Sequence, residues 1–189
     1  TQCTVVTTGM GPRASQRVTG VHLAAAGSAF SVEGVRFFAP MHGMMNVRNA
    51  AMAASAAMHF GVTLEQSARA LSAFEGLADR QEARDAGGCI LVNDKATHPQ
   101  SIAGLREALR QRYPDRRLVS VMQPRATGGR RWIYQRDLPG ALAGFDKVIL
   151  TSPYEHRPTG DTAWKQEPFC VDTLADALCA RGVDVQVVP

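Results

Sequence analysis

The chain has 189 residues, of which 45% are hydrophobic and 20% are charged, and its formal net charge is +4. This length suits one large domain or a domain and a half, and the composition is ordinary for a folded protein with a buried core. The modest charge and an aromatic content of 6% argue against a nucleic-acid-binding protein, in which a dense basic stripe is usually interleaved with aromatic residues.

The first 75 residues divide into a β part and a helical part. The stretch SAFSVEGVRFFA (28–39) alternates apolar and polar residues around Glu33-Gly34, which predicts a hairpin, and no strand before it looks long enough to complete a domain. The Ala- and Met-rich stretch 46–60 predicts a helix that stops at Gly61. A second helix follows over 63–74, with Thr63 and Gln66 at capping-box spacing.

The remainder of the chain alternates strands with helices after a polar, Gly-containing boundary at 75–88. We expect strands at 89–93, 117–122, 147–151 and 183–188, and helices at 99–112, 133–143 and 171–182, with a long loop at 152–168. This alternation is typical of an α/β fold with a parallel, Rossmann-like sheet and right-handed crossovers.

Two features bear on the compartment. No run of about 18 apolar residues is present, and residues 1–12 lack a basic start and an apolar stretch, so we expect neither membrane insertion nor a signal peptide. The four cysteines are scattered and form no C-x-x-C pair, which suits free thiols in a reducing cytoplasm. Because the sequence begins with Thr, we also expect it to be part of a longer chain.

Polar residues follow three of the expected strands. The first strand ends in NDKATH (93–98), the second in QPR (123–125) and the third in SPYEHR (152–157). Ligands of open α/β sheets lie beyond the carboxyl ends of the strands, so Lys95, Arg125 and Arg157 are expected at one edge, facing an anionic ligand. The sequence contains neither a G-x-x-x-x-G-K-[ST] loop nor a G-x-G-x-x-G motif, so nucleotide chemistry cannot be complete within these residues.

Each polar residue also has a purely structural alternative. His98 and Asp94 can cap the helix that begins at Pro99, and Asn49 can help to start the Ala-rich helix. Arg80 can form a surface ion pair with Glu82 or Asp85.

Four stretches resemble motifs of the Mur ligase family, the ATP-dependent amide-forming enzymes of peptidoglycan synthesis. GMMNVRNAAMAASAAMHFGV (43–62) is similar to the segment G-x-H-N-x-x-N-x-x-A-A, and FEGLADRQE (74–82) to the junction that leads into the C-terminal domain. VNDKATHPQSIAGL (92–105) resembles D-D-Y-A-H-H-P, and MQPRATGGRRWIYQRDLPGAL (122–142) resembles the E-P-R-S-N-T…L-P-x-x-L pattern of the tripeptide-adding member, which looks nearest.

The resemblance implies that residues 1–75 are the end of a central ATP-binding domain, and that 76–189 are a C-terminal domain whose end we expect to be cut short. It implies an enzyme that uses ATP and Mg²⁺, both held mainly by other parts of the protein, to join a peptide or amino acid to a UDP-N-acetylmuramate-type nucleotide sugar through an acyl phosphate. This stretch alone is expected to be inactive, and it supplies no catalytic residue and no metal ligand.

The resemblance also assigns nucleotide-binding roles. Asn46 and Asn49 would face the adenine, Arg80 would approach a phosphate, and Asn93 or Asp94 would hold the ribose.

On the substrate side, Lys95, Thr97 and His98 would line the cleft that faces the incoming peptide. Arg125 would pair with a peptide carboxylate, which a planar guanidinium can grip with two hydrogen bonds.

Four positions depart from the family pattern. Met45 stands in place of a histidine, Asp79 in place of the first of two arginines, Asn93 in place of an aspartate, and Lys95 in place of an aromatic residue. Two alternatives to a ligase therefore remain, namely a diverged non-catalytic Mur-like domain that binds a nucleotide or peptide, and an unrelated Rossmann-like binding module.

Overall fold

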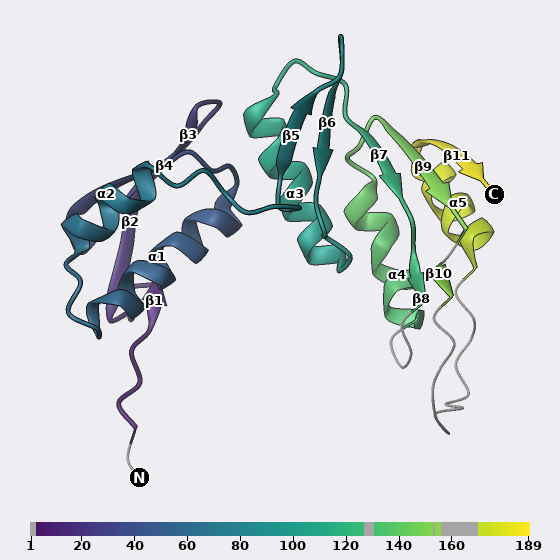
Figure 1. The fold of residues 1–189 in the computed structure, drawn as a ribbon. Helices are drawn as coiled ribbons and strands as arrows, with labels where there is room; N and C mark the ends of the chain where they lie inside the picture. The colour runs from purple at the N-terminus through teal and green to yellow at the C-terminus, as the bar shows by residue number, and fades with distance from the viewer. Residues whose placement is uncertain (1–2, 127–130, 153, 156–169) are drawn as a thin grey trace. The chain divides into compact units, whose positions relative to one another are not determined.

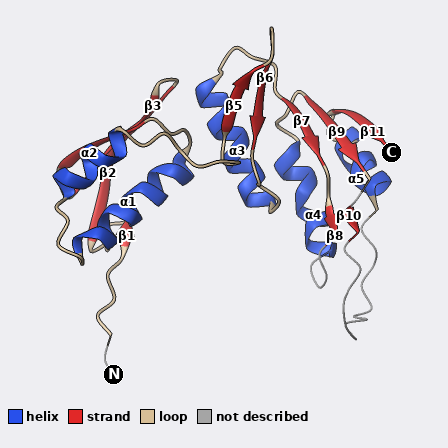
Figure 2. Ribbon diagram, viewed as in Figure 1, coloured by secondary structure: helices blue, strands red, loops and turns tan. Residues whose placement is uncertain are grey.

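The structure is a computed structural model that describes residues 3–126, 131–152, 154–155 and 170–189. The chain divides into two compact units. The first consists of Thr1–Lys95 and Glu107–Pro114, and the second of Ala96–Arg106 and Asp115–Pro189. Figures 1 and 2 show the helices and strands of both units.

A four-stranded sheet of order β1-β2-β3-β4 forms the centre of the first unit. Its strands are β1 (Thr8–Gly9), β2 (Gln16–Ala24), β3 (Gly27–Val32) and β4 (Val35–Ala39). β1 runs parallel to β2, and the other pairs are antiparallel. The predicted hairpin at Glu33-Gly34 is confirmed, with φ of 46° and 82°, the positive values that a two-residue type I′ turn requires.

We expected no strand before this hairpin that is long enough to complete a domain, but β2, with nine residues, precedes the hairpin and pairs with β3. The pairing register of β2 with β3 shifts between Thr19 and His22, and Gly20 has a φ of 58°. Such an irregularity breaks the alternation of apolar and polar residues by which a strand is recognised in a sequence.

A glycine is required where β3 begins. Gly27 has a φ of 147°, and a Cβ added there would lie 2.5 Å from the carbonyl oxygen of Ala39. Any side chain at this position would therefore push β3 away from the end of β4.

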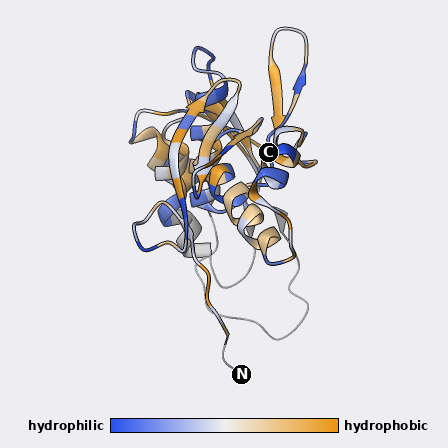
Figure 3. Cartoon of the chain, turned by 90° about the vertical axis from the view of Figure 1, so that its left-hand side faces the viewer, coloured by the Kyte–Doolittle hydropathy of each residue, from blue (hydrophilic) through white to orange (hydrophobic). Residues whose placement is uncertain are grey.

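Two helices pack with this sheet, namely α1 (Met44–Met58) and α2 (Leu64–Ser72). The buried core includes Phe30 and Phe37, whose stacked rings have centroids 5.2 Å apart, together with Val32, Val47 and Ala51. Strongly hydrophobic segments of the chain are visible in Figure 3. The predicted capping box at the start of α2 is confirmed, since both its hydrogen bonds are present.

The first unit also contains a hairpin of β5 (Glu82–Asp85) and β6 (Ile90–Asn93), which pair antiparallel. We predicted strand 89–93 as the first member of the parallel sheet, and this prediction is wrong; strand β5 also lies within the polar stretch 75–88, where no strand was expected. Gly87 and Gly88, with φ of 66° and 100°, turn the chain back on itself, so β6 pairs with its sequence neighbour. The polar sequence of β5, Glu-Ala-Arg-Asp, concealed this strand.

The second unit contains the predicted parallel sheet, of order β11-β9-β7. Its strands are β7 (Val119–Met122), β9 (Lys147–Thr151) and β11 (Asp184–Val188). The helices α4 (Arg131–Leu142) and α5 (Val171–Cys179) alternate with these strands along the chain, and β8 (Arg125–Ala126) pairs in parallel with β10 (Tyr154–Glu155). The α/β, Rossmann-like fold class is therefore confirmed.

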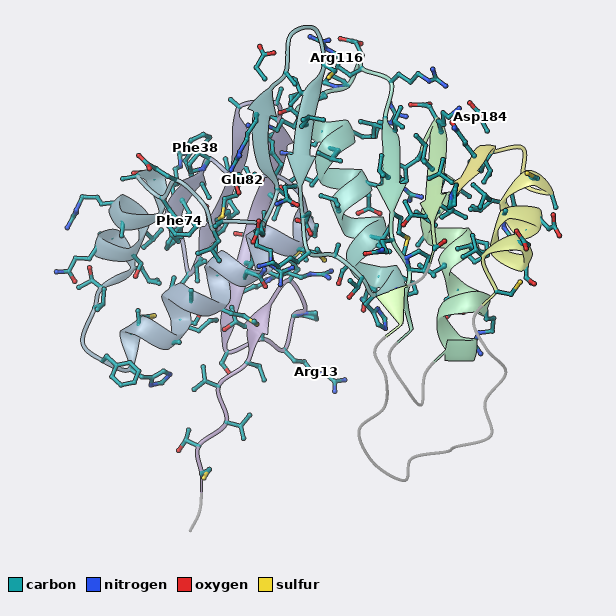
Figure 4. All side chains as sticks on the ribbon, turned by 45° about the vertical axis from the view of Figure 1, so that its right-hand side comes forward. Arg13, Phe38, Phe74, Glu82, Arg116 and Asp184 are labelled. Atoms are coloured by element: carbon teal, nitrogen blue, oxygen red, sulfur yellow. The ribbon has the colours of Figure 1, made fainter. Side chains whose placement is uncertain are left out.

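Fully buried aliphatic side chains fill the second unit, and they are Leu138, Leu142, Val148, Leu150, Leu174 and Leu178. At the surface, Asp184 pairs with Arg117 and Lys147 at 3.3 and 3.5 Å, and Figure 4 labels this aspartate. Among the described residues, no helix combines the length and the apolar content that a bilayer crossing requires.

Helix α3 (Pro99–Arg112) begins in the second unit, and its last turns belong to the first. In this last part, Gln111 accepts a hydrogen bond from the backbone N–H of Gly43 at 2.7 Å and donates to the carbonyls of Ala24 and Gly27 at 2.8 and 3.2 Å. Residues 107–114 therefore complete the first unit, although they are distant from it in sequence. The predicted domain boundary after residue 75 stays a prediction.

Candidate functional site

The candidate site is built on the short turn that precedes β5. Within it, Asp79 and Gln81 have positive φ of 56° and 51°, an uncommon backbone conformation for residues with side chains. Two carboxylates stabilise it: Glu82, labelled in Figure 4, accepts from the N–H of Asp79 at 3.1 Å, and Asp94 accepts from the N–H of Gln81 at 2.9 Å. The turn is thus fixed from both sides, and Arg80 lies between its two strained residues.

Arg80 and Asp94, both predicted site residues, lie together. Their Nη1 and Oδ1 atoms are 4.0 Å apart, and the side chain of Arg80 is 58% exposed whereas that of Asp94 is 9% exposed. The predicted alternative of a pair between Arg80 and Glu82 is not what forms, because Glu82 accepts from Arg84 at 2.7 Å. A guanidinium that is exposed and only loosely paired can bind an anion at small cost.

The end of β6 brings two further predicted residues to the same turn. Asn93 donates from Nδ2 to Oδ1 of Asp79 at 2.6 Å, and Lys95 places Nζ 2.6 Å from Oδ2. The hydrogen bond and the charge of Lys95 hold the pKa of Asp79 below its usual range, and Asn93 adds to the effect. The carboxylate of Asp79 therefore contacts two of the predicted binding residues, Asn93 and Lys95.

Asn46 and Asn49 lie near the start of α1. Asn46 donates to the carbonyl of His42 at 2.9 Å, and the same carbonyl accepts from Gln81 at 3.5 Å, so this segment is linked to the turn that carries Arg80. His42 itself is buried and bonds the Ala25 carbonyl at 2.9 Å, and burial lowers the pKa of its imidazole. Asn49 is exposed on α1.

The remaining predicted residues belong to the second unit. His98 caps α3: its carbonyl accepts from the N–H of Ile102 at 3.0 Å, and its Nδ1 accepts from the N–H of Gln100 at 3.2 Å. This is the capping alternative that the sequence offered. Thr97 is partly buried, and Arg125 lies in β8, with its side chain outside the described part of the chain.

The structure therefore brings together five of the predicted residues within the first unit, namely Asn46, Arg80, Asn93, Asp94 and Lys95. The expectation that three strand ends of one sheet meet is wrong for the first of them, because β6 belongs to the β5–β6 sheet, which is separate from the sheet of β7 and β9. Arg157 lies outside the described residues.

Sequence reasoning gave no role to Gln81 or Gln111, and it considered Glu82 only as an ion-pair partner of Arg80, whereas Glu82 accepts from the N–H of Asp79 in the turn. The acidic and amide residues around Arg80 were visible as a polar run, but the sequence contains no signal for the pairing of this run with residues 93–95. Nor does it signal the contact of Gln111 with Gly43, 68 residues away.

Comparisons with known proteins agree with the fold and the motifs. No protein-family model matches the chain. The chain is 33% identical over 160 residues to the UDP-N-acetylmuramate–L-alanine ligase of Halorhodospira halophila, an alignment that covers 79% of this chain and 33% of that protein. It thus spans about a third of the length of the curated relatives it matches.

Solved structures show the same fold. The UDP-N-acetylmuramate–alanine ligase MurC of Thermotoga maritima has a TM-score of 0.77 at 19% identity, covering 97% of this chain and 39% of that one. A murein peptide ligase of Psychrobacter arcticus has a TM-score of 0.64 at 22% identity, covering 96% and 38%. The expected likeness to the tripeptide-adding member is thus present in the fold, while the sequence relative from Halorhodospira halophila is named as an L-alanine ligase. From its sequence relatives and its fold, the chain belongs to the Mur ligase family.

Proposed function

We propose that the chain is part of an ATP-dependent ligase of peptidoglycan synthesis or recycling that works in the cytoplasm. The enzyme joins an amino acid or peptide to a UDP-N-acetylmuramate-type nucleotide sugar. The observation that carries the proposal is the group of Arg80, Asn93, Asp94 and Lys95 at one fixed turn, in a chain whose relatives are named as ligases of this kind.

The described residues fit one side of a nucleotide. The exposed guanidinium of Arg80 suits a phosphate, and the carboxylate of Asp94 and the amide of Asn93 suit ribose hydroxyls. Asn46 and Asn49 would contribute amide groups toward the adenine. ATP supplies the phosphoryl group of the reaction, and these residues would bind and orient it.

Mg²⁺ is a different case. Among the described residues, no three His, Cys, Asp or Glu side chains come together as a metal site. The family resemblance implies that the ion is held mainly by other parts of the enzyme.

Lys95, Thr97, His98 and Arg125 would serve the second substrate. In the proposed reaction a substrate carboxylate takes the γ-phosphoryl group of ATP, and ADP leaves. The incoming amine then attacks the acyl carbon, phosphate departs with the electron pair of the C–O bond, and the amine loses a proton as the amide forms. Cations such as Lys95 would stabilise the negative charge that develops on the acyl phosphate.

A second candidate is a non-catalytic Mur-like domain that binds a nucleotide or peptide. The observation in its favour is that Met45, Asp79 and Asn93 replace residues of the family pattern.

A coupled phosphate-release assay on the full-length polypeptide that contains this chain distinguishes the two. It should be run with ATP, Mg²⁺, UDP-N-acetylmuramate and a panel of amino acids, including L-alanine, and peptides. We expect phosphate release that depends on both the nucleotide sugar and one class of amine. Release that is absent with every amine, in a protein that still binds nucleotide, would favour the non-catalytic alternative.

A further inference from the structure

Three of the four departures from the family pattern are in contact with one another. Asp79, Asn93 and Lys95 stand where the resemblance expects an arginine, an aspartate and an aromatic residue. In the structure the single carboxylate of Asp79 meets both other side chains, Asn93 at 2.6 Å through Oδ1 and Lys95 at 2.6 Å through Oδ2. These substitutions therefore form one bonded group.

The charges of the three residues explain why they occur together. An arginine at position 79 would face the ammonium of Lys95, and an aspartate at position 93 would face the carboxylate of Asp79. Like charges at such distances repel. Changing position 79 alone or position 95 alone would therefore create a repulsive contact, whereas in the set of Asp79, Asn93 and Lys95 the carboxylate accepts from both other side chains.

Asp79 is itself held firmly. Its N–H donates to Glu82 at 3.1 Å, and its carbonyl accepts from the N–H of Lys95 at 3.1 Å. Its φ of 56° persists because these bonds fix the turn on both sides. With 35% of its side chain exposed, against 61% for Lys95, Asp79 is the less exposed partner of this pair.

We propose that Asp79 is a positioning residue: it holds the amide of Asn93 and the ammonium of Lys95 at the end of β6, beside Arg80. The inference rests on the proposed function only in that Asn93 and Lys95 belong to the proposed binding site. Asp79 acts through these two side chains, so its effect on a ligand should vanish when they are absent.

The first test needs no ligand. In NMR spectra of the 189-residue chain, Asp79→Ala should shift the side-chain amide signals of Asn93 and the ammonium signal of Lys95. Glu75→Ala, which removes an exposed carboxylate just before the turn, serves as the matched control and should leave them in place. If Asp79→Ala disorders the turn, the isosteric Asp79→Asn should still shift the Lys95 signal. Unchanged Asn93 and Lys95 signals would overturn the inference.

The second test separates positioning from general stability, with ADP and Mg²⁺ as the probe. Asp79→Ala should weaken ADP binding by about two- to fivefold in the wild-type background, and it should have no further effect in a chain that carries Asn93→Ala and Lys95→Ala. Equal weakening in both backgrounds would overturn the inference. The measurement uses the full-length polypeptide that contains this chain; if its wild-type form does not bind ADP, the nucleotide part of the proposed function fails, and the first test alone decides the role of Asp79.

Discussion

Asp79 and Lys95 form an ion pair near the surface, and its strength can be measured in a titration. Because Lys95 holds the pKa of Asp79 below its usual range, the carboxyl should titrate below about 3.9 in the folded chain. The pair then favours the folded state above about pH 4, and this contribution is lost as the pH falls through the lower folded-state pKa.

The measurement is a ¹³C NMR titration of the Asp79 carboxyl. In Lys95→Met the midpoint should rise toward the ordinary value, whereas in the control Arg69→Met, on the separate helix α2, it should not move. A wild-type midpoint at or above the ordinary value would show that the pair does not form in solution.

Arg125 has a role that the family resemblance implies, and kinetics can test it. If its guanidinium pairs with a carboxylate of the incoming peptide, Arg125→Ala in the complete enzyme should raise the KM for the peptide by about tenfold or more and change the KM for ATP little. Steady-state kinetics in both substrates measure the two values. Equal changes in both would remove the assigned role.

At the level of single residues, the family resemblance named Arg80, Asn93 and Asp94 as site residues, and these lie at one turn, but it gave no indication of the contacts that hold them there. Arg80 and Asp94 were both assigned to the site, and they form an ion pair. The hydrogen bond of Asn93 to Asp79 joins residues that are 14 positions apart, and its formation depends on the strained turn at 79–81. Backbone strain of this kind leaves no mark in composition or periodicity.

At the level of elements, helix boundaries marked by side-chain chemistry were predictable. Thr63 caps α2 as the spacing of Thr63 and Gln66 predicted. Strands were predictable where alternation is regular, as in β3 and β4, and were missed where a register shift or a polar sequence hides them, as in β2 and β5. The predicted partner of β6 was wrong, because the hydrophobicity of a segment indicates that it forms a strand but not which strand it pairs with.

The capping box of α2 should contribute measurably to stability. Thr63→Ala removes the side-chain oxygen that accepts from the N–H of Gln66, and we expect the free energy of unfolding to fall by about 1 kcal/mol. Chemical denaturation measures this value. The matched control is Ser72→Ala at the other end of the same helix, where the hydroxyl only donates to the carbonyl of Arg69, and it should cost clearly less. A larger loss for Ser72→Ala than for Thr63→Ala would contradict this account.

At the level of the whole molecule, the 189-residue chain should not hydrolyse ATP. It contains no G-x-x-x-x-G-K-[ST] loop, whose backbone amides and lysine hold the β- and γ-phosphates in enzymes that use it. Incubation of the purified chain with ATP and Mg²⁺ should release phosphate no faster than a buffer blank. Steady turnover by the chain would contradict the proposal that another part of the enzyme supplies this step.

The contacts of Gln111 determine which fragments of the protein keep all the hydrogen bonds of the first unit. Its amide group meets the amide of Gly43 and the carbonyls of Ala24 and Gly27, so a polypeptide cut after residue 75 or 95 would lack a partner that these backbone groups have in the intact chain. An N-terminal fragment that ends at either position would therefore be less stable than the same residues in the intact chain, because it lacks the hydrogen bonds of Gln111. Addition of a separate peptide that spans residues 99–114 should restore the stability of this fragment, as complementary fragments of a split protein reassemble.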